Sequence, residues 1–177
     1  VACYEEDADT QTLEETFGKL CAAACIWEEK MLSRRQERDA SLSALPFPYD
    51  SYRAGQRQFA AGVYVAIRDR KRLFAQAPTG IGKTMAALYP ALRALGEGKC
   101  SRVLYLTART TGRKSATDAL ALLESRGAKL SAVEIAAKDK LCPQERRDCR
   151  AEVCPYAEGF YDRLPYAVSE AFSGGIW

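Results

Sequence analysis

Apolar residues recur at intervals of three and four along four stretches of the chain, with polar residues between them. This spacing places the apolar side chains on one face of a helix. Thr12 and Glu15 have the spacing of a capping box, so we expect the first helix to begin there and to run to about Arg38. Gly96 and Gly127 follow the third and fourth stretches as glycines follow helix ends. The pattern therefore predicts helices over residues 12–38, 51–69, 83–95 and 111–126.

Three shorter runs are apolar at their centres and are typical of buried strands. They cover residues 71–76, 102–107 and 130–137, and they alternate with the predicted helices. Strands that alternate with helices favour a parallel sheet covered by helices on both faces. The predicted fold class is therefore α/β, with an incomplete sheet.

The predicted elements divide the chain into three parts. An acidic segment and an amphipathic helix occupy residues 1–45, and a proline-bearing connector ends that part. The α/β part extends over residues 46–137. Residues 138–177 form a cysteine-rich insertion.

A glycine-bearing turn joins the first strand-like run to the third helix, with the sequence Ala77-Pro78-Thr79-Gly80-Ile81-Gly82-Lys83-Thr84. Gly80 and Gly82 allow positive φ and a close approach of the backbone to phosphate. The backbone N–H groups of such a turn and the helix N-terminus attract an anion. Lys83 can reach the β- and γ-phosphates of a nucleoside triphosphate, and the Thr84 hydroxyl can bind Mg²⁺. The turn therefore predicts a site for ATP and Mg²⁺ over residues 78–84, with Lys83 and Thr84 as its catalytic residues.

Composition narrows the classes of function. The chain has no histidine, which excludes histidine-dependent catalytic triads and the two-histidine zinc finger. No apolar run is long enough to span a membrane, and no signal peptide begins the chain. Seven cysteines without a secretory signal indicate a reducing compartment, so we expect a cytoplasmic protein without a membrane partner. Because the chain begins with Val1, we also expect it to be a fragment of a longer protein.

Three cysteines, Cys142, Cys149 and Cys154, lie in a polar segment without apolar periodicity. Cysteine is usually buried, so three of them in such a segment suggest thiolate ligands. They suit a four-cysteine iron–sulfur cluster or a structural zinc, and unliganded thiols are the alternative. We expect the fourth ligand to lie beyond residue 177. Cys21 and Cys25 lie four residues apart on the first helix and are expected to be small packing residues.

Four motifs occur in a characteristic order. They are Ala75-Gln76-Ala77-Pro78-Thr79-Gly80-Ile81-Gly82-Lys83-Thr84, Tyr105-Leu106-Thr107-Ala108-Arg109-Thr110, Lys138-Asp139-Lys140-Leu141-Cys142 and Cys154-Pro155-Tyr156-Ala157. This order resembles the XPD/DinG family of iron–sulfur superfamily 2 DNA helicases, bacterial DinG-like members in particular, over about residues 45–170. Ala77 in place of the usual first glycine of the loop is the variant common in superfamily 2 helicases.

The resemblance implies an ATP-dependent DNA helicase that acts on single-stranded or partly duplex DNA. Its first motor domain would have the RecA-like P-loop fold. The residues that would contact the adenine are Tyr52, Arg53 and Gln56. The residues that would contact the backbone of single-stranded DNA are Thr107, Arg109 and Thr110. Three ligands of a 4Fe–4S cluster would be Cys142, Cys149 and Cys154. Relatives often carry histidine and serine where this chain has Thr111 and Gly112, so its DNA contacts are expected to differ in detail.

ATP hydrolysis needs a carboxylate that holds Mg²⁺ and orients the attacking water, and no strand-like run here ends in one. Glu134 lies inside its run and is a poor substitute. We therefore expect this chain to bind ATP weakly without turning it over. Two other functions stay open. One is a non-motor P-loop ATPase with a zinc module, and the other is a metal-stabilised nucleic-acid-binding domain without catalysis. The sequence predicts no oligomeric state.

Overall fold

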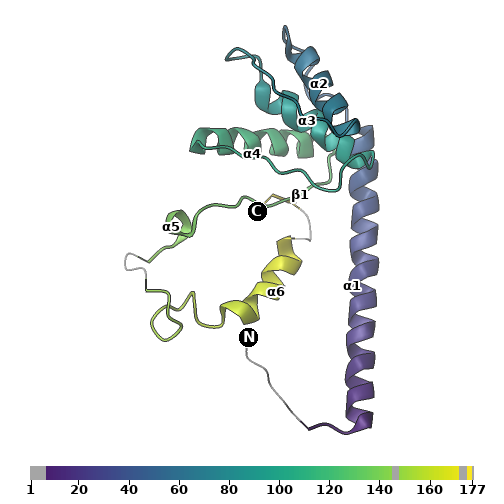
Figure 1. Cartoon of the computed structure of the whole chain (residues 1–177), viewed down its shortest axis with the longest axis vertical. Coiled ribbons are helices and arrows are strands. Elements are labelled where there is room, and N and C mark those ends of the chain that lie inside the picture. Colours follow the sequence, from purple (N-terminus) through teal and green to yellow (C-terminus); the bar gives the residue numbers. More distant parts are fainter. Residues whose placement is uncertain (1–6, 145–147, 172–174, 177) are drawn as a thin grey trace. The chain divides into compact units, whose positions relative to one another are not determined.

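The computed structural model of the chain describes residues 7–144, 148–171 and 175–176 (Figure 1). The chain separates into two compact units, Val1–Glu37 and Arg38–Trp177. Helix α1 (Thr10–Ala44) begins in the first unit and ends in the second. Only the last turns of α1 therefore belong to the second unit.

Asp9 caps the first helix. Its Oδ1 accepts a hydrogen bond of 2.7 Å from the backbone N–H of Thr12, and this bond holds the pKa of the Asp9 carboxyl below its ordinary value. An N-terminal cap satisfies one of the N–H groups that a helix leaves without a partner. The predicted helix is confirmed, but the cap predicted at Thr12 is wrong because Asp9 has that role.

The part of α1 in the first unit is exposed all around. Every residue from 7 to 30 is exposed, and large apolar side chains such as Phe17 and Ile26 have 70% and 67% of their surface accessible. Cys21 and Cys25 are exposed as well. Within the described residues they do not form the buried packing face that the sequence predicts.

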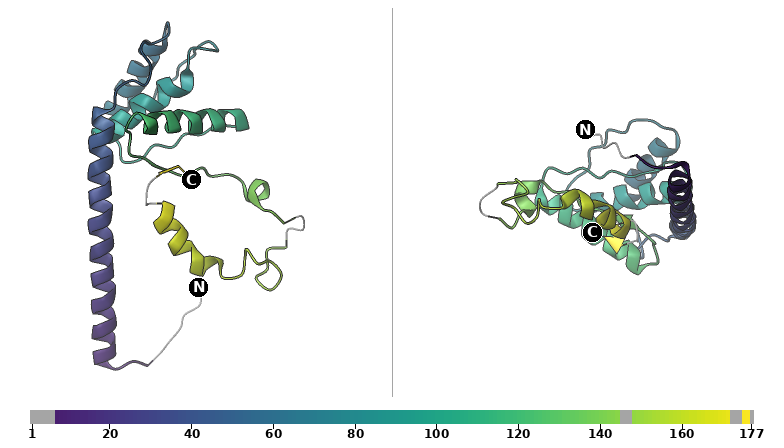
Figure 2. Two further views of the ribbon diagram at one scale, coloured as in Figure 1. Left: turned by 180° about the vertical axis from the view of Figure 1, so that it is seen from behind. Right: turned by 90° about the horizontal axis from the view of Figure 1, so that it is seen from below.

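Helix α3 (Lys83–Gly96) is the centre of the second unit. It packs against both α2 (Gln56–Arg68) and α4 (Thr110–Ser125) (Figures 1 and 2). Leu42 in the last turn of α1, and Leu45 just after it, are almost fully buried beside these helices. Burial of a leucine side chain stabilises a fold by about 1.5–3 kcal/mol, so these contacts fix the last turn of α1 to the unit. The core consists of Leu42, Leu45, Met85, Leu88, Tyr89, Leu92, Leu95, Ala116, Ala119, Leu123, Ala128 and Leu130.

The predicted third and fourth helices are confirmed to within one residue at each end. The second helix begins at Gln56 and not at residue 51, because Gly55 before it has a φ of +77°. Helix α1 continues past its predicted end to Ala44, and the Ser43 hydroxyl donates to a carbonyl one turn earlier at 2.7 Å. Pro46 follows closely, and proline cannot continue a helix.

Strands are short in the described part of the chain. β1 (Ser131–Ala132) pairs in parallel with β2 (Gly175–Ile176), with Ser131 opposite Gly175. β1 lies inside the predicted third strand, whereas residues 71–76 and 102–107 have no strand. Strands need hydrogen-bonded neighbours, and the apolar side chains of these two runs remain open, with Phe74 and Leu106 about nine-tenths exposed. The parallel α/β sheet therefore stays a prediction.

The cysteine-rich part contains two further helices, α5 (Lys138–Leu141) and α6 (Phe160–Ala171). The sequence pattern did not predict α6, and none of its described side chains is buried. None of the helices in the described ranges combines the length and the apolar composition needed to cross a membrane.

Candidate nucleotide-binding site

The phosphate loop has the backbone conformation that its glycines predict. Gly80 and Gly82 have φ angles of +87° and +80°, in the left-handed region that side chains with a β-carbon rarely adopt. Gly82 is the residue just before α3, and its carbonyl accepts the first helical hydrogen bond, 3.0 Å from the N–H of Ala86. The loop therefore leads directly into the N-terminus of a 14-residue helix, where backbone N–H groups and the helix dipole favour an anion.

Lys83 folds back over the loop. Its Nζ donates hydrogen bonds to the carbonyls of Ala77 at 3.1 Å and of Pro78 at 2.7 Å. The side chain is exposed, and that of Thr84 is half-buried. An ammonium group held by neutral carbonyls at the surface can exchange these partners for the stronger, charge-assisted bonds that phosphate oxygens offer.

Arg53 and Gln56, predicted from the sequence to lie on the base side of the site, contact the loop itself. The Gln56 side chain is almost fully buried, and its Nε2 donates to the carbonyl of Gly82 at 3.3 Å. Its Oε1 accepts from the backbone N–H of Arg53 at 3.0 Å. The Arg53 guanidinium donates to the carbonyl of Gly80. These bonds join residues 26 and 27 positions apart and bring both side chains to the phosphate loop.

Gly82 is also required by this packing. A β-carbon at that position would lie 2.5 Å from Gln56 Nε2, well inside van der Waals contact. Both the positive φ and the nearby amide therefore select glycine, for two separate reasons.

Tyr52, the third residue predicted on the base side, packs in a different manner. Its ring stacks on Phe47 with centroids 3.7 Å apart and planes 17° apart, and burial raises the pKa of the Tyr52 hydroxyl. Phe47 also contacts the rings of Tyr49 and Tyr89 edge-on. The sequence interpretation treated residues 41–50 only as a connector and missed this cluster. The sequence feature that could have indicated the cluster is an aromatic residue, Phe47, between Pro46 and Pro48.

The three residues predicted to bind DNA gather at the N-terminus of α4. Arg109 precedes the helix in an extended conformation, and Thr110 is its first residue. The Thr107 hydroxyl lies 3.4 Å from the Arg109 backbone N–H. A β-carbon at Gly112 would lie 2.2 Å from that hydroxyl, so the absence of a side chain at Gly112 makes room for Thr107. All three predicted residues are exposed.

The three cysteine side chains do not gather in the described structure. Cys142 is half-buried, Cys149 is exposed and Cys154 is buried. Across the described residues, no group of three or more cysteine, aspartate and glutamate side chains has a geometry that could hold a metal ion. The metal site therefore stays a prediction from the thiol chemistry alone.

Glu134, the carboxylate inside the third predicted strand, is bound to α4. It forms an ion pair of 3.0 Å with Arg113 and accepts a hydrogen bond from Thr117 at 3.4 Å. The pair fixes the segment after β1 to the helix, which is a structural role.

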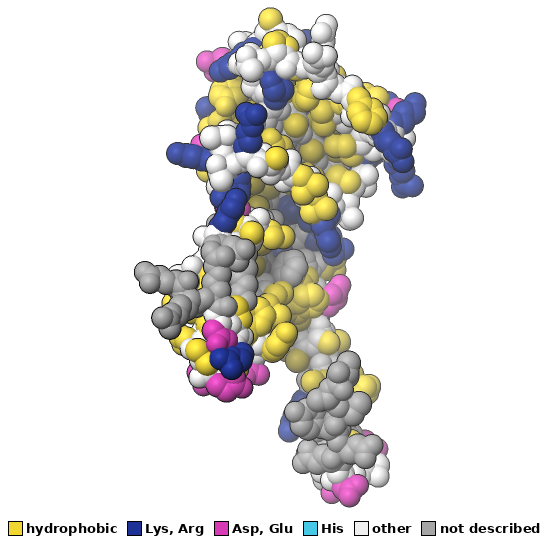
Figure 3. Space-filling view, turned by 60° about the vertical axis from the view of Figure 1, so that its left-hand side comes forward, with side chains coloured by type: hydrophobic (Ala, Val, Ile, Leu, Met, Phe, Trp, Pro, Cys, Tyr) yellow, Lys and Arg dark blue, Asp and Glu magenta, His cyan; other side chains and the backbone are white. Residues whose placement is uncertain are grey.

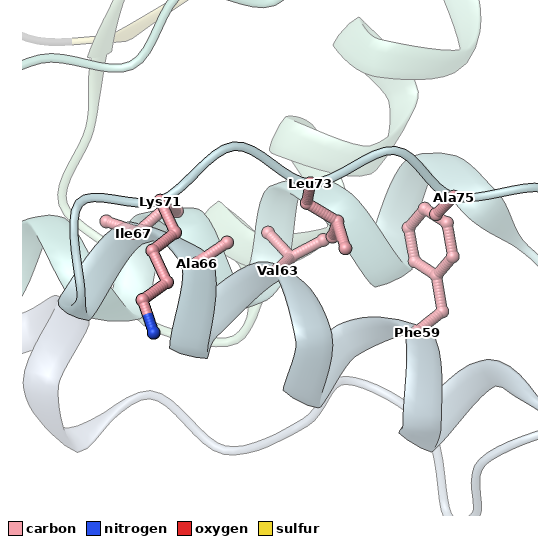
Figure 4. A pocket seen from close by; sticks show the side chains of 7 residues that line it. All are labelled: Phe59, Val63, Ala66, Ile67, Lys71, Leu73 and Ala75. Carbon is pink, nitrogen blue, oxygen red and sulfur yellow. The ribbon is translucent and has the colours of Figure 1, made fainter.

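An apolar groove lies beside the segment that leads into the phosphate loop. Its volume is about 390 Å³, and Figure 4 shows one face of α2 opposite residues 71–75. Lys71 is the one charged residue among those that line the groove. The lining consists of Phe59, Val63, Ala66, Ile67, Lys71, Leu73 and Ala75. Figure 3 shows apolar side chains at the surface of the part that holds α2 to α4, with lysine and arginine side chains around them.

Residues 54–151, more than half of the chain, match the family model described as DEAD/DEAH box helicase. A stretch of 61 residues is 41% identical to a probable ATP-dependent helicase of Methanocaldococcus jannaschii. That stretch covers 34% of this chain and 9% of the relative, so the chain corresponds to a small part of that protein. No solved structure matches the chain.

Proposed function

The chain belongs to the DEAD/DEAH box helicase family, and we propose that it is the nucleotide-binding part of an ATP-dependent DNA helicase. One observation carries the proposal. Arg53 and Gln56 are bonded to the carbonyls of Gly80 and Gly82, and the loop that contains these glycines begins α3. The expected base side and the phosphate side of a nucleotide site are thereby part of one hydrogen-bonded unit.

In this proposal each part of the loop has a defined task. The backbone N–H groups at the start of α3 bind the phosphates, and Lys83 moves from the loop carbonyls to the β- and γ-phosphates. Thr84 supplies a hydroxyl ligand to Mg²⁺. Arg53 and Gln56 supply hydrogen-bonding groups to the adenine, with Tyr52 beside them.

The test is binding of Mg²⁺–ATP by isothermal titration calorimetry. Lys83→Ala should weaken binding at least about tenfold, because it removes charge-assisted hydrogen bonds to phosphate. Lys99→Ala is the matched control, since Lys99 is an exposed lysine just after the opposite end of α3, and it should leave the affinity unchanged. Equal affinities for the parent and the Lys83 variant would refute the proposal.

We also propose that the chain binds ATP without hydrolysing it, because Glu134 is held on α4 by Arg113 and Thr117. Phosphate release should stay at the level of the Lys83→Ala variant, with and without single-stranded DNA. Turnover above that level would show that a carboxylate of this chain completes the catalytic site.

Thr107, Arg109 and Thr110 are proposed to bind the phosphates of single-stranded DNA. They are exposed, and Arg109 and Thr110 are the N-cap and the first residue of α4, where backbone N–H groups favour anions. Arg109→Ala should weaken binding of a fluorescent oligonucleotide and lower the slope of log affinity against log salt by about 0.7. Arg126→Ala, at the exposed opposite end of the same helix, is the control. A preference for RNA of the same sequence would assign the site to RNA.

Cys142, Cys149 and Cys154 are proposed to be thiolate ligands of an iron–sulfur cluster, with zinc as the alternative. The support is the donor set, which is three thiols within a short polar segment without apolar periodicity. Protein purified without oxygen should contain iron and acid-labile sulfide, and Cys149→Ser should lose both, whereas Cys21→Ser, at an exposed position on α1, should keep them. Stoichiometric zinc would favour a structural zinc site, and neither metal would refute the assignment.

A further inference from the structure

A cluster of aromatic rings is built around Phe47, in the connector between α1 and α2. Phe47 stacks on Tyr52 with ring centroids 3.7 Å apart, and it meets Tyr49 and Tyr89 edge-on at 5.6 and 5.3 Å. Phe47 is the shared member of all three ring contacts. Stacked and edge-on geometries both stabilise aromatic pairs beyond the burial of their surface.

The connector that carries Phe47 is fixed to the helix of the phosphate loop. Leu45 is almost fully buried, and its carbonyl accepts hydrogen bonds from the Tyr89 hydroxyl at 3.1 Å and from Arg93 Nη1 at 3.3 Å. Tyr89 and Arg93 both lie on α3, and Glu97 holds the Arg93 guanidinium at 3.2 Å. Phe47 is therefore attached, two residues from Leu45, to the same helix that begins at Lys83.

The ring stack leads directly to the residues that contact the loop. Tyr52 is followed by Arg53, whose guanidinium donates to the Gly80 carbonyl. The backbone N–H of Arg53 donates to Gln56, which donates in turn to the Gly82 carbonyl. The stack on Phe47 fixes Tyr52, and Tyr52 is the residue just before Arg53. Without the Phe47 ring, the backbone at Arg53 is therefore less well fixed.

We propose that Phe47 is a positioning residue of the nucleotide site, which holds Tyr52, and through it Arg53 and Gln56, in place before the nucleotide binds. The inference rests on the proposed function and assigns the ligand class as a nucleoside triphosphate recognised at both ends. Phosphate binding depends on Lys83 and the loop backbone, whereas the ring contacts of Phe47 are with Tyr49, Tyr52 and Tyr89. Loss of Phe47 should therefore weaken recognition of the nucleoside and spare recognition of the triphosphate.

The experiment compares two ligands, Mg²⁺–ATP and Mg²⁺–tripolyphosphate, by calorimetry on three proteins: the parent chain, Phe47→Leu and Phe47→Tyr. The parent should bind ATP more tightly than tripolyphosphate. Phe47→Leu should weaken ATP binding roughly three- to tenfold, the range expected for one aromatic pair, and change tripolyphosphate binding less than about twofold. Phe47→Tyr keeps the ring and should restore the affinity for ATP.

A second comparison separates positioning from direct contact. Tyr52→Leu should also weaken ATP binding, and the double variant with Phe47→Leu should be no weaker than Tyr52→Leu, because Phe47 acts through Tyr52. If circular dichroism shows that Phe47→Leu is unfolded, Phe47→Met replaces it, since methionine has a similar volume and adapts to the space left by the ring.

Several outcomes would overturn the inference. One is that Phe47→Leu weakens the binding of both ligands by the same factor, as a general loss of loop structure would. Another is that Phe47→Leu leaves ATP binding unchanged. Failure of Phe47→Tyr to restore ATP binding would also overturn it. A parent that binds both ligands equally would refute the base-side role while leaving phosphate binding intact. A parent that binds neither ligand would refute the proposed function, and this inference with it.

Discussion

Gly96, the last residue of α3, lies against residues 39–43 in the last turns of α1. A β-carbon there would lie 2.6 Å from Leu42 Cβ, 2.8 Å from the Ser43 backbone nitrogen and 2.9 Å from the Asp39 carbonyl oxygen. Two of these three atoms belong to the backbone of α1, which cannot rotate away as a flexible side chain could. We therefore predict that Gly96→Ala separates the two helices and destabilises the second unit.

The magnitude follows from two opposing effects. Carbon atoms in contact are normally about 3.5–4.0 Å apart, so the new methyl group would be about 1 Å too close to Leu42, a residue with no exposed surface. Overpacking of this kind costs about 1–3 kcal/mol. Alanine is better than glycine in a helix by about 0.5–1 kcal/mol, which offsets part of the cost. We expect a net loss of about 1–2 kcal/mol in the free energy of unfolding.

Gly62 supplies the matched control. It lies inside α2, and the nearest atom to a β-carbon there would be Leu73 Cδ2 at 3.7 Å, an ordinary van der Waals contact. Gly62→Ala should therefore stabilise the protein by about 0.5 kcal/mol through helix propensity alone. The two variants make the same chemical change and should have effects of opposite sign.

Equilibrium unfolding in urea, followed by circular dichroism, measures both variants. With a slope of about 2 kcal/mol per molar, Gly96→Ala should lower the midpoint by roughly 0.5–1 M, with the slope unchanged. A midpoint for Gly96→Ala equal to or above that of Gly62→Ala would refute the reasoning, because it would mean that α1 and α3 do not approach at Gly96.

Three further predictions concern the second unit. Tyr64→Phe removes the hydroxyl that chiefly holds the pKa of the Glu97 carboxyl low. A carboxyl whose pKa is lowered by folding stabilises the fold fully above its unfolded pKa, and this stabilisation is lost as the pH falls through the folded pKa. The free energy of unfolding of the variant should be about 1 kcal/mol lower than that of the parent at pH 7, and the difference should be smaller below about pH 4. Urea unfolding at both pH values measures this difference. An equal loss at both pH values would contradict the prediction. Gly112→Ala forces the Thr107 hydroxyl to turn away from the start of α4. The affinity for single-stranded DNA should therefore fall several-fold, whereas the affinity for ATP should stay the same. An unchanged affinity for DNA would contradict this prediction. Gly82→Ala should abolish ATP binding and lower the urea midpoint of unfolding, because position 82 requires both a positive φ and space beside Gln56. Calorimetry and urea unfolding measure the two effects. A variant that bound ATP like the parent would show that the loop relaxes around the new methyl group.

Elements with local signals could be predicted from the amino-acid sequence. α3 and α4 were predicted to within one residue because their apolar residues repeat at helical spacing and glycines follow their ends. The positive φ of Gly80 and Gly82 could be expected for the same reason, since a glycine in such a turn acts on its own backbone. The cap of α1 was placed wrongly because Asp9 and Thr12 both suit that role, and only the observed hydrogen bond distinguishes them.

Contacts between residues far apart in the chain could not be predicted in this way, because they depend on how the helices pack. The bonds from Arg53 and Gln56 to the loop glycines, the stack of Phe47 on Tyr52 and the approach of α1 at Gly96 join segments that no local pattern connects. Helical periodicity predicts which face of a helix is apolar. It does not predict which other helix packs against that face, or which side chains then lie within hydrogen-bond distance. That choice depends on packing α3 between its neighbours, because the helices must fill space together before any one contact is fixed.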